Sequence, residues 1–358
     1  MAHNILRPLA LAALSTALAA PALASNVLPL TGTPTSASTV PRNGDVNPYG
    51  VAFVPKGFPT LKGGLVAGDV LVSNFNNKKN LQGTGTTIVR IPASGKPSVF
   101  FAGLPTLGLT TALEVLRAGF VMVGNLPAPS GSAKTARPGS LIILNPSGNI
   151  IQTLGLPMIN GPWDMTVFET SDSLAAYITN ALDGTVYRLD FSFEGPLGIE
   201  LEAVTKIAQG YTHKSDPVTF VDAPTGGAYA PGKDVLYVAA TADNAVYAID
   251  HAGDRTTPVN KGRLVYQDAT HLHGPLGLVL APNGHLITTN NDAINSDPKQ
   301  PSELVEFTQA GKFVAQFSID KEQGGSFGLD IQTTGPHAGK LAAVDDVDNT
   351  LKIWTIGF

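Results

Sequence analysis

Residues 178–190 read ITNALDGTVYRLD, and two later stretches repeat this pattern. Residues 239–250 read AATADNAVYAID, and residues 344–354 read VDDVDNTLKIW. In each, an apolar strand is followed by a short polar turn with Asp-Gly or Asp-Asn, and a second apolar strand begins. Such dipeptides between strand-like segments are strong hairpin signals. The repetition therefore predicts a β-hairpin that recurs along the chain.

The hairpin belongs to a larger unit that occurs six times. Five copies enter their first strand through a glycine: Gly50, Gly161, Gly226, Gly277 and Gly328. The remaining copy fits at residues 107–116 without this glycine. A period near 50 residues with four short strands is typical of a β-propeller, in which neighbouring sheets pack face to face around an axis. We therefore expect an all-β fold, a six-bladed β-propeller with four-stranded antiparallel blades.

The last repeat lacks a fourth strand, because the chain stops at Phe358 soon after the third. Residues 26–40 precede the first repeat and have no other place in the pattern. We expect this N-terminal segment to supply the outer strand of the last blade. Closing the ring in this way would leave no open seam between the first and last blades.

Residues 1–24 have the features of a cleaved signal peptide. Arg7 supplies a positive charge, residues 9–20 form an apolar run, and Ala-Leu-Ala at 22–24 precedes Ser25 as a cleavage site. An N-terminal membrane anchor is the alternative, although the run is short for a membrane span. We expect an exported protein, periplasmic or secreted, with one propeller domain over residues 25–358 and no membrane attachment after cleavage.

The composition narrows the function classes. Charged residues make up 14% of the chain, against roughly 25% in an average globular domain. The absence of cysteine excludes thiolate catalysis, disulfides and cysteine-based zinc sites. The net charge is −5 and the densest basic cluster is Lys78–Lys79, so we expect no nucleic-acid binding. We expect a monomer.

The second strands of the repeats end in a column of polar residues. In a propeller these positions gather at one end of the ring, here called the top face. The column consists of Asn74, Asn125, Asn180, Ala240, Asn290 and Asp345. One interpretation is that Asn and Asp simply begin the turns. The other is a polar ring that offers oxygen atoms to a cation or a polar ligand, with Asn180, Asn290 and Asp345 as metal ligands and Asn74 and Asn125 as ligand-binding residues.

Three of the turns after the second strands are long. They cover residues 75–85, 126–139 and 291–302, and all extend from the predicted top face. Long loops on one face of a repeat scaffold are typical of its binding side. Neutral variation of surface loops is the alternative explanation.

Three further side chains are candidates for chemistry near the channel mouth. His271 and His273 precede the first strand of the fifth repeat, where His273 could act as a general base or metal ligand and His271 could bind a ligand. Trp163 could line the channel, although packing in the core is the alternative, as an ordinary loop role is for the histidines. Residues 324–328 read GGSFG and match G-x-S-x-G, but they do not precede a strand-to-helix turn, so we reject a nucleophile elbow.

Residues 160–190 resemble the repeats of two groups of six-bladed propellers, the NHL-repeat proteins and the gluconolactonase–regucalcin group. The second resemblance implies a divalent metal at the channel mouth, held by a Glu, two Asn and an Asp that doubles as general base. Asn160 matches one of these asparagines, whereas Asn47, Thr110 and Thr225 stand at or near the other expected positions. Residues 273–292 also faintly resemble soluble quinoprotein sugar dehydrogenases, which need several arginines; near the predicted top this chain offers Arg42 and Arg137.

Two functions remain open from the sequence. The leading hypothesis is a non-catalytic binding scaffold that takes a small polar molecule, a glycan or a protein at its top face. The alternative is a metal-dependent hydrolase of the lactonase or esterase kind, with Asn160 as a metal ligand and Asp164, Asp345 or His273 as the base. No cofactor is required by the first hypothesis; the second would use a divalent metal, Ca²⁺ or Zn²⁺.

Overall fold

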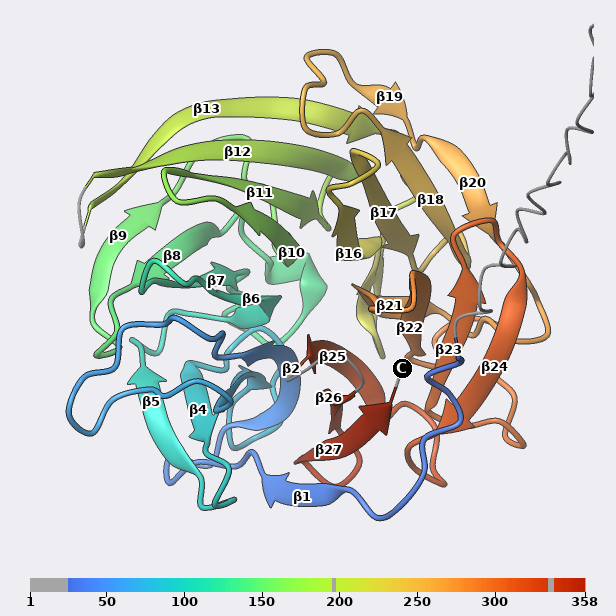
Figure 1. The fold of residues 1–358 in the computed structure, drawn as a ribbon, viewed down its shortest axis with the longest axis horizontal. Helices are drawn as coiled ribbons and strands as arrows, with labels where there is room; N and C mark the ends of the chain where they lie inside the picture. Colours follow the sequence, from blue (N-terminus) through green and yellow to red (C-terminus); the bar gives the residue numbers. More distant parts are fainter. Residues whose placement is uncertain (1–24, 195–197, 334–337, 358) are drawn as a thin grey trace, which may run out of the picture.

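The structure is a computed structural model that describes residues 25–194, 198–333 and 338–357. It is a ring of six antiparallel sheets around a central axis, so the predicted six-bladed propeller is confirmed (Figure 1). The predicted signal peptide lies outside the described residues. Within them, no helix is long and apolar enough to cross a membrane.

Each blade consists of an inner, two middle and one outer strand. The first three blades have these bounds: β2 Val46–Phe53, β3 Val70–Asn76, β4 Thr87–Ile91 and β5 Ser98–Ala102; β6 Leu109–Val115, β7 Val121–Asn125, β8 Ser140–Leu144 and β9 Ile150–Leu154; β10 Pro162–Glu169, β11 Ser173–Asn180, β12 Thr185–Glu194 and β13 Gly198–Gln209. A short strand, β19 (Val259–Asn260), extends the third sheet by pairing parallel with β13.

The other three blades follow the same plan: β16 Pro224–Ala230, β17 Val235–Ala240, β18 Ala245–Asp250 and β20 Arg263–Tyr266; β21 Pro275–Leu280, β22 His285–Asn290, β23 Glu303–Thr308 and β24 Phe313–Ser318; β25 Ser326–Thr333, β26 Ala338–Asp345, β27 Thr350–Gly357 and β1 Thr35–Ser38. Two elements lie outside the blades, the hairpin β14 (Lys214–Asp216) and β15 (Phe220–Asp222), and the 3₁₀ turn Ala133–Thr135.

The N-terminal segment closes the ring as predicted. Strand β1 pairs antiparallel with β27, with Thr35 opposite Ile353 and Ser38 opposite Thr350. The residues before β1 run over the outside of the fifth and sixth blades, where Val27, Leu28 and Leu30 are buried against Trp354 and its neighbours. The sixth blade therefore combines strands from both ends of the described chain (Figure 1).

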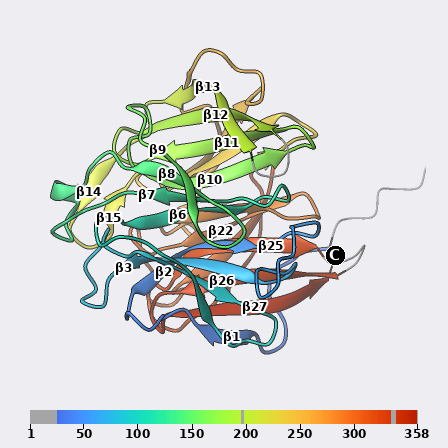
Figure 2. The ribbon, with the colours of Figure 1, turned by 90° about the vertical axis from the view of Figure 1, so that its left-hand side faces the viewer.

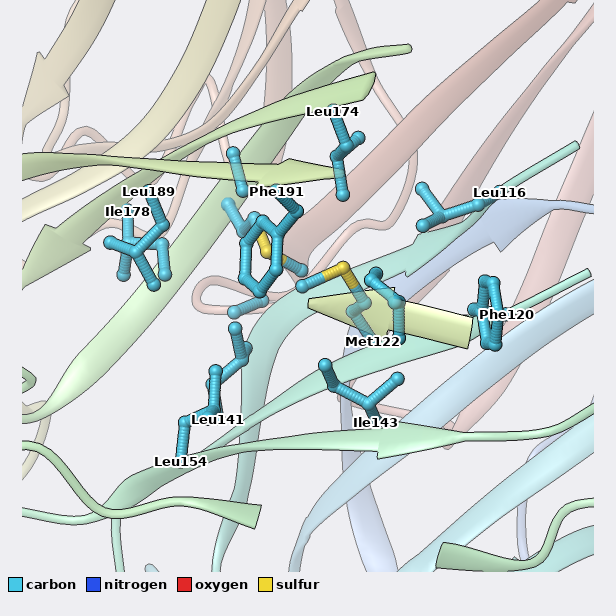
Figure 3. Close-up of a cluster of buried hydrophobic side chains, with 14 of the residues drawn as sticks. Leu116, Phe120, Met122, Leu141, Ile143, Leu154, Leu174, Ile178, Leu189 and Phe191 are labelled. Carbon is cyan, nitrogen blue, oxygen red and sulfur yellow. The ribbon is translucent and has the colours of Figure 1, made fainter. Parts of the chain in front are cut away.

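The hydrophobic core is divided among the blade interfaces. Six clusters of buried apolar side chains each lie between one pair of neighbouring blades. Figure 3 shows the one between blades 2 and 3, where Met122 and Ile143 face Phe191 and Leu174. Because a single sheet cannot bury both of its faces alone, each blade depends on its two neighbours for its core.

The glycines of the inner strands allow the blades to approach closely at the axis. A Cβ atom on Gly328 would lie 1.8 Å from the carbonyl oxygen of Tyr49, and one on Gly226 would lie 2.2 Å from that of Leu276. These contacts are to the backbone of the next inner strand, which cannot turn aside as a side chain can. The register shift between each inner strand and its neighbour falls in this same region. Gly226 and Gly328 are thus packing requirements of the ring, whereas Gly161 precedes β10 and has a φ of 77°.

Candidate functional site

The top end of the central channel is filled by aromatic side chains. Tyr49, Phe75, Trp163 and Phe220 are at most 2% exposed and belong to one buried cluster. The ring of Tyr49 stacks on those of Phe75 and Phe327, with centroid distances of 4.8 and 4.7 Å. Trp163 was predicted either to line the channel or to pack in the core. Its ring packs in a buried cluster that lies at the mouth of the channel.

Phe220 reaches this cluster from the β14–β15 hairpin, which lies at one end of the ring axis (Figure 2). Its ring stacks on Trp163 at 6.1 Å and meets the edge of Phe75 at 5.2 Å. The φ angle of Phe220 is 69°, which is unusual for a bulky residue and costs on the order of 1–3 kcal/mol. We infer that burial of the ring offsets this strain and holds the hairpin over the channel.

A cavity of about 220 Å³ lies below the aromatic cluster, lined by the inner strands of all six blades. Its wall carries Glu114, Asp164 and Asp330, one each from blades 2, 3 and 6. Burial raises the pKa of Asp164 to about 7 and that of Asp330 to about 6. Burial, and then the charges of Asp330 and Asp164, raises the pKa of Glu114 well above its usual range. Asp164, predicted as a catalytic base, is thus a channel residue with acidic neighbours.

The amides at the ends of the second strands are buried and bonded within their own blades. Asn180 donates to the carbonyl of Met158 and to Oγ1 of Thr185, at 2.8 and 3.1 Å, and its Oδ1 accepts from the backbone N–H of Asn160. Asn125 makes the equivalent bonds to Ser140 Oγ and the N–H of Gly108. Each amide therefore joins three segments of its blade, namely the approach to the inner strand, the second strand and the start of the third.

Asn74 and Asn290 follow the same plan in blades 1 and 5. Asn74 donates to the carbonyl of Thr39 and to Oγ1 of Thr87. Asn290 donates to the carbonyl of His271 and to Oε2 of Glu303, and accepts from the N–H of His273. These bonds explain why Asn recurs at the position; a role for the amides in binding a metal or ligand remains a prediction.

Asn160, the position that matches the lactonase group, has a carboxylate beside it. Its Nδ2 donates to Oδ2 of Asp183 at 3.1 Å, and Oδ1 of Asp183 accepts from Thr185 Oγ1 at 2.5 Å. Asn160 and Asn180 are therefore brought together in blade 3, with Asp183 from the turn between β11 and β12. Asp183 is a residue that the sequence did not single out.

The two histidines of blade 5 occupy different environments. His271 is paired with Asp268 at 2.5 Å through Nδ1, and its ring stacks on Phe313 with centroids 3.8 Å apart. His273 is only 2% exposed; its Nδ1 lies 2.5 Å from the carbonyl oxygen of Asn295 and its Nε2 lies 3.9 Å from Oε1 of Glu303. Burial, and then the charge of Asp292, raises the pKa of Glu303 to about 8.

The carboxylate of Asp345 forms an ion pair with a lysine. The ammonium of Lys352 pairs with Asp345 and also lies 3.6 and 3.7 Å from Asp320 and Asp348. The three carboxylates have ligand atoms within 4.8 Å of one another, as do Asp234, His251 and Asp254 in the turns of blade 4 at the opposite face. Acidic groups that could hold a metal are therefore present, although the ammonium of Lys352 already lies among the first set.

Two of the three long loops enclose an open pocket. The loops of blades 1 and 2 line a pocket of about 570 Å³ on the top face, beside the channel. Lys78, Lys79 and Arg137 supply three exposed cations, whereas Leu81 and Leu107 supply apolar surface. Asp45 is buried at its floor, where its carboxylate accepts hydrogen bonds from Thr86 and Thr87. The long loops and the two lysines were visible in the sequence, but their convergence on one pocket was not predicted.

The third long loop is fastened to its own blade. Oδ2 of Asp292 accepts from the N–H groups of Ser302 and Gly324, at 3.0 and 2.7 Å, and His273 holds the carbonyl of Asn295. The candidate ligand-binding residues thus fall into separate places: the amides inside the blades, His273 under its loop, Asp164 in the channel and the cationic pocket between blades 1 and 2.

The structure resembles several solved propellers. A gluconolactonase from Xanthomonas campestris is 12% identical with a TM-score of 0.53, and covers 94% of this chain and 98% of its own. A calcium-binding regucalcin from Agrobacterium tumefaciens is 13% identical with a TM-score of 0.55, and covers 90% and 94%. A protein described as a putative glucose dehydrogenase from Thermus thermophilus is 14% identical with a TM-score of 0.52, and covers 89% and 99%.

At this level of identity the likeness shows the fold, which is that of the six-bladed propellers of the gluconolactonase and regucalcin type. No protein-family model matches the sequence, and no curated protein matches it. The predicted likeness to these propellers is confirmed for the architecture, while the likeness to NHL repeats remains a prediction.

Proposed function

We propose that this protein is a non-catalytic binding propeller that holds a small anionic molecule in the pocket between the loops of blades 1 and 2. The pocket itself carries the proposal. Its volume of about 570 Å³ lies within the roughly 300–1,000 Å³ of small-molecule sites. It is formed by two of the three long loops of the top face, above the strands of blades 1 and 2.

The charges around the pocket favour an anion with an apolar body. Arg137 offers a planar fork that suits carboxylate or phosphate groups, and Lys78 and Lys79 act as point charges. Within the described chain, no ion pair neutralises these three cations. Leu81 and Leu107 provide the apolar contact that binds the remainder of the ligand.

A ligand panel and a charge-removal variant test this proposal. Isothermal calorimetry with benzoate, glutarate, citrate and inorganic phosphate should find at least one that binds, whereas the neutral benzamide and glutaramide should not. The variant K78A/K79A/R137A should lose the binding. The variant K299A/K312A/K321A removes three exposed cations elsewhere and should keep it. Equal binding by both variants would contradict the proposal.

A metal-dependent hydrolase is the second candidate, and the pair Asn160–Asp183 favours it. Asp183 places an ionisable group in contact with the one position that matches the lactonase group. The residues predicted to complete that centre do not join it, since Asp345 pairs with Lys352 and His273 faces Glu303. Hydrolysis of lactones and esters that requires added Ca²⁺ or Zn²⁺ and is lost in D183N would establish this function in place of the first.

Export and the monomeric state belong to the same proposal. The apolar run and Ala-Leu-Ala site before Ser25 support cleavage there and delivery to the periplasm or medium. Mass spectrometry of the protein from its native host should find Ser25 as the first residue, and size-exclusion chromatography with light scattering should give the mass of one chain.

A further inference from the structure

The cavity in the central channel has an unusual balance of charge. Glu114, Asp164 and Asp330 line it, and among the described residues of its wall there is no Lys, Arg or His. Lys56 and Lys340 lie further out, in a second pocket at the lower mouth of the channel, which shares Glu114 and Asp330 with the cavity. Neither lysine forms an ion pair with these carboxylates in the described structure. Three acidic groups thus face one small space.

Two of these carboxylates are fixed in place by the neighbouring blades. Oδ2 of Asp164 accepts from the backbone N–H of Gly227 in blade 4 at 3.1 Å. Oδ2 of Asp330 accepts from the N–H of Phe53 in blade 1 at 2.7 Å. Each aspartate therefore bridges an interface between inner strands, and its position is set by the ring. Glu114 has no hydrogen-bond partner within the described residues, which leaves its carboxylate free for a ligand.

A separate observation points to an occupant of the cavity. Thr111 comes from the same inner strand as Glu114 and lines the same cavity, and it is only 6% exposed. Its Oγ1 is buried and has no hydrogen-bond partner in the part of the chain that the structure describes. Buried hydroxyl groups are nearly always hydrogen-bonded to protein, water or a ligand. Thr111 lines the cavity, so a ligand held there could supply this missing partner.

The spacing of the carboxylates decides what kind of cation fits. Glu114, Asp164 and Asp330 are too far apart to bind one bare ion together, because their oxygen atoms do not all lie within 4.8 Å of one another. A bare ion could not touch all of them. A hydrated Mg²⁺ ion could, because its waters lie about 2.1 Å from the metal and reach acceptors about 2.7 Å further out. Such an ion spans carboxylate oxygens up to roughly 9 Å apart.

We infer that the central channel binds a hydrated Mg²⁺ ion, held through its water shell by Glu114, Asp164, Asp330 and Thr111. The cavity has room for several waters, and the lower mouth gives access to it. The ion would favour the ionised forms of three acidic groups that the fold buries together. This site lies below the aromatic cluster and is independent of the pocket between blades 1 and 2.

The site is tested by titrating the purified full chain, freed of metal with EDTA, with MgCl₂ at pH 8. Isothermal calorimetry and thermal unfolding should show Mg²⁺ binding that raises the midpoint. E114Q and D330N should bind Mg²⁺ at least tenfold more weakly, whereas E200Q, a change on the exposed edge of blade 3, should match the wild type. In EDTA, E114Q should be as stable as the wild type or more so, which shows that it folds.

Two further measurements separate this site from other ways of binding Mg²⁺. Hexaamminecobalt(III), which has the shape of hexahydrated Mg²⁺ but cannot exchange its ligands, should compete with Mg²⁺ in the wild type. T111V keeps all three charges and should weaken binding by a smaller factor than E114Q. No response to Mg²⁺, an equal response in E114Q, or failure of the cobalt complex to compete would each overturn the inference.

Discussion

Nε2 of His273 lies 3.9 Å from Oε1 of Glu303, and both atoms are buried without a hydrogen-bond partner in the described chain. Nδ1 of the same imidazole lies 2.5 Å from the carbonyl oxygen of Asn295, so in the neutral imidazole Nδ1 carries the proton and Nε2 presents a lone pair. Two acceptors would face each other if Glu303 were ionised. Its raised pKa of about 8 means that the carboxyl group keeps a proton at neutral pH.

This proton makes stability depend on pH. The pKa of Glu303 in the folded state lies above its ordinary value of 4.5, so the folded protein holds a proton that the unfolded chain releases. The contribution is complete below about pH 4.5 and declines as the pH rises toward 8, by at most about 1.4 kcal/mol for each pH unit. The glutamine of E303Q stays neutral at every pH. Urea unfolding between pH 5 and 8 should therefore find the two proteins similar near pH 5, and the wild type increasingly less stable than E303Q as the pH rises. Parallel curves would refute this assignment.

Glu306 should anchor the N-terminal segment. Its buried carboxylate accepts from the N–H groups of Val27 and Leu28, and from Nδ1 of His285 at 2.7 Å. E306A would leave these donors without an acceptor, and each unsatisfied buried donor costs about 1–3 kcal/mol. We expect a large drop in the free energy of unfolding, and faster cleavage before β1 in limited proteolysis. E322A, an exposed change, is the control and should alter neither.

Gly226 should not tolerate a side chain. A Cβ there would lie 2.2 Å from the carbonyl oxygen of Leu276, in the backbone of blade 5. We expect G226A to destabilise the protein by about 1–3 kcal/mol, the usual cost of overpacking. Gly155 has open space where its Cβ would be, so G155A is the matched control and should change the midpoint of thermal unfolding little. If G226A left the midpoint of thermal unfolding unchanged, blades 4 and 5 would be less closely packed than described.

Asn180 tests the two interpretations of the amide column. It bonds Met158, Thr185 and Asn160 at once, so N180A should lower the free energy of unfolding by about 1–3 kcal/mol. Ala240 occupies the same position in blade 4, which shows that a blade can form without the amide. If N180A kept its stability but lost metal or ligand binding, the amide would belong to a site instead.

The repeat was sufficient to predict the ring, because hairpin signals and the spacing of the glycines are local features of the sequence. The β1–β27 pairing followed from counting strands in the last unit. Asn180 shows the limit of such reasoning: the column was visible, but whether an amide points into its blade or toward a ligand depends on bonds to Met158 and Asn160 that the period does not encode.

The channel was harder to predict for a physical reason. Phe220 lies in an insertion outside the repeat, and its contact with Trp163 joins residues far apart in the chain. Glu114 and Asp330 are single acids in apolar inner strands, and each comes from a different blade. The available signal was an acidic residue within an otherwise apolar inner strand. The convergence of these two residues with Asp164 on one cavity becomes apparent only when the ring is closed.

Because β1 pairs with β27, the sixth blade can form only after both of these strands have been synthesised. Strand β1 leaves the ribosome before every blade, and β27 leaves after all the others. A nascent chain can stack blades one upon another, but it cannot lock the circle until translation has passed Gly357. Nonsense truncation late in the coding sequence would leave a ring without the β1–β27 pairing, and its unpaired edge strand would be open to proteases.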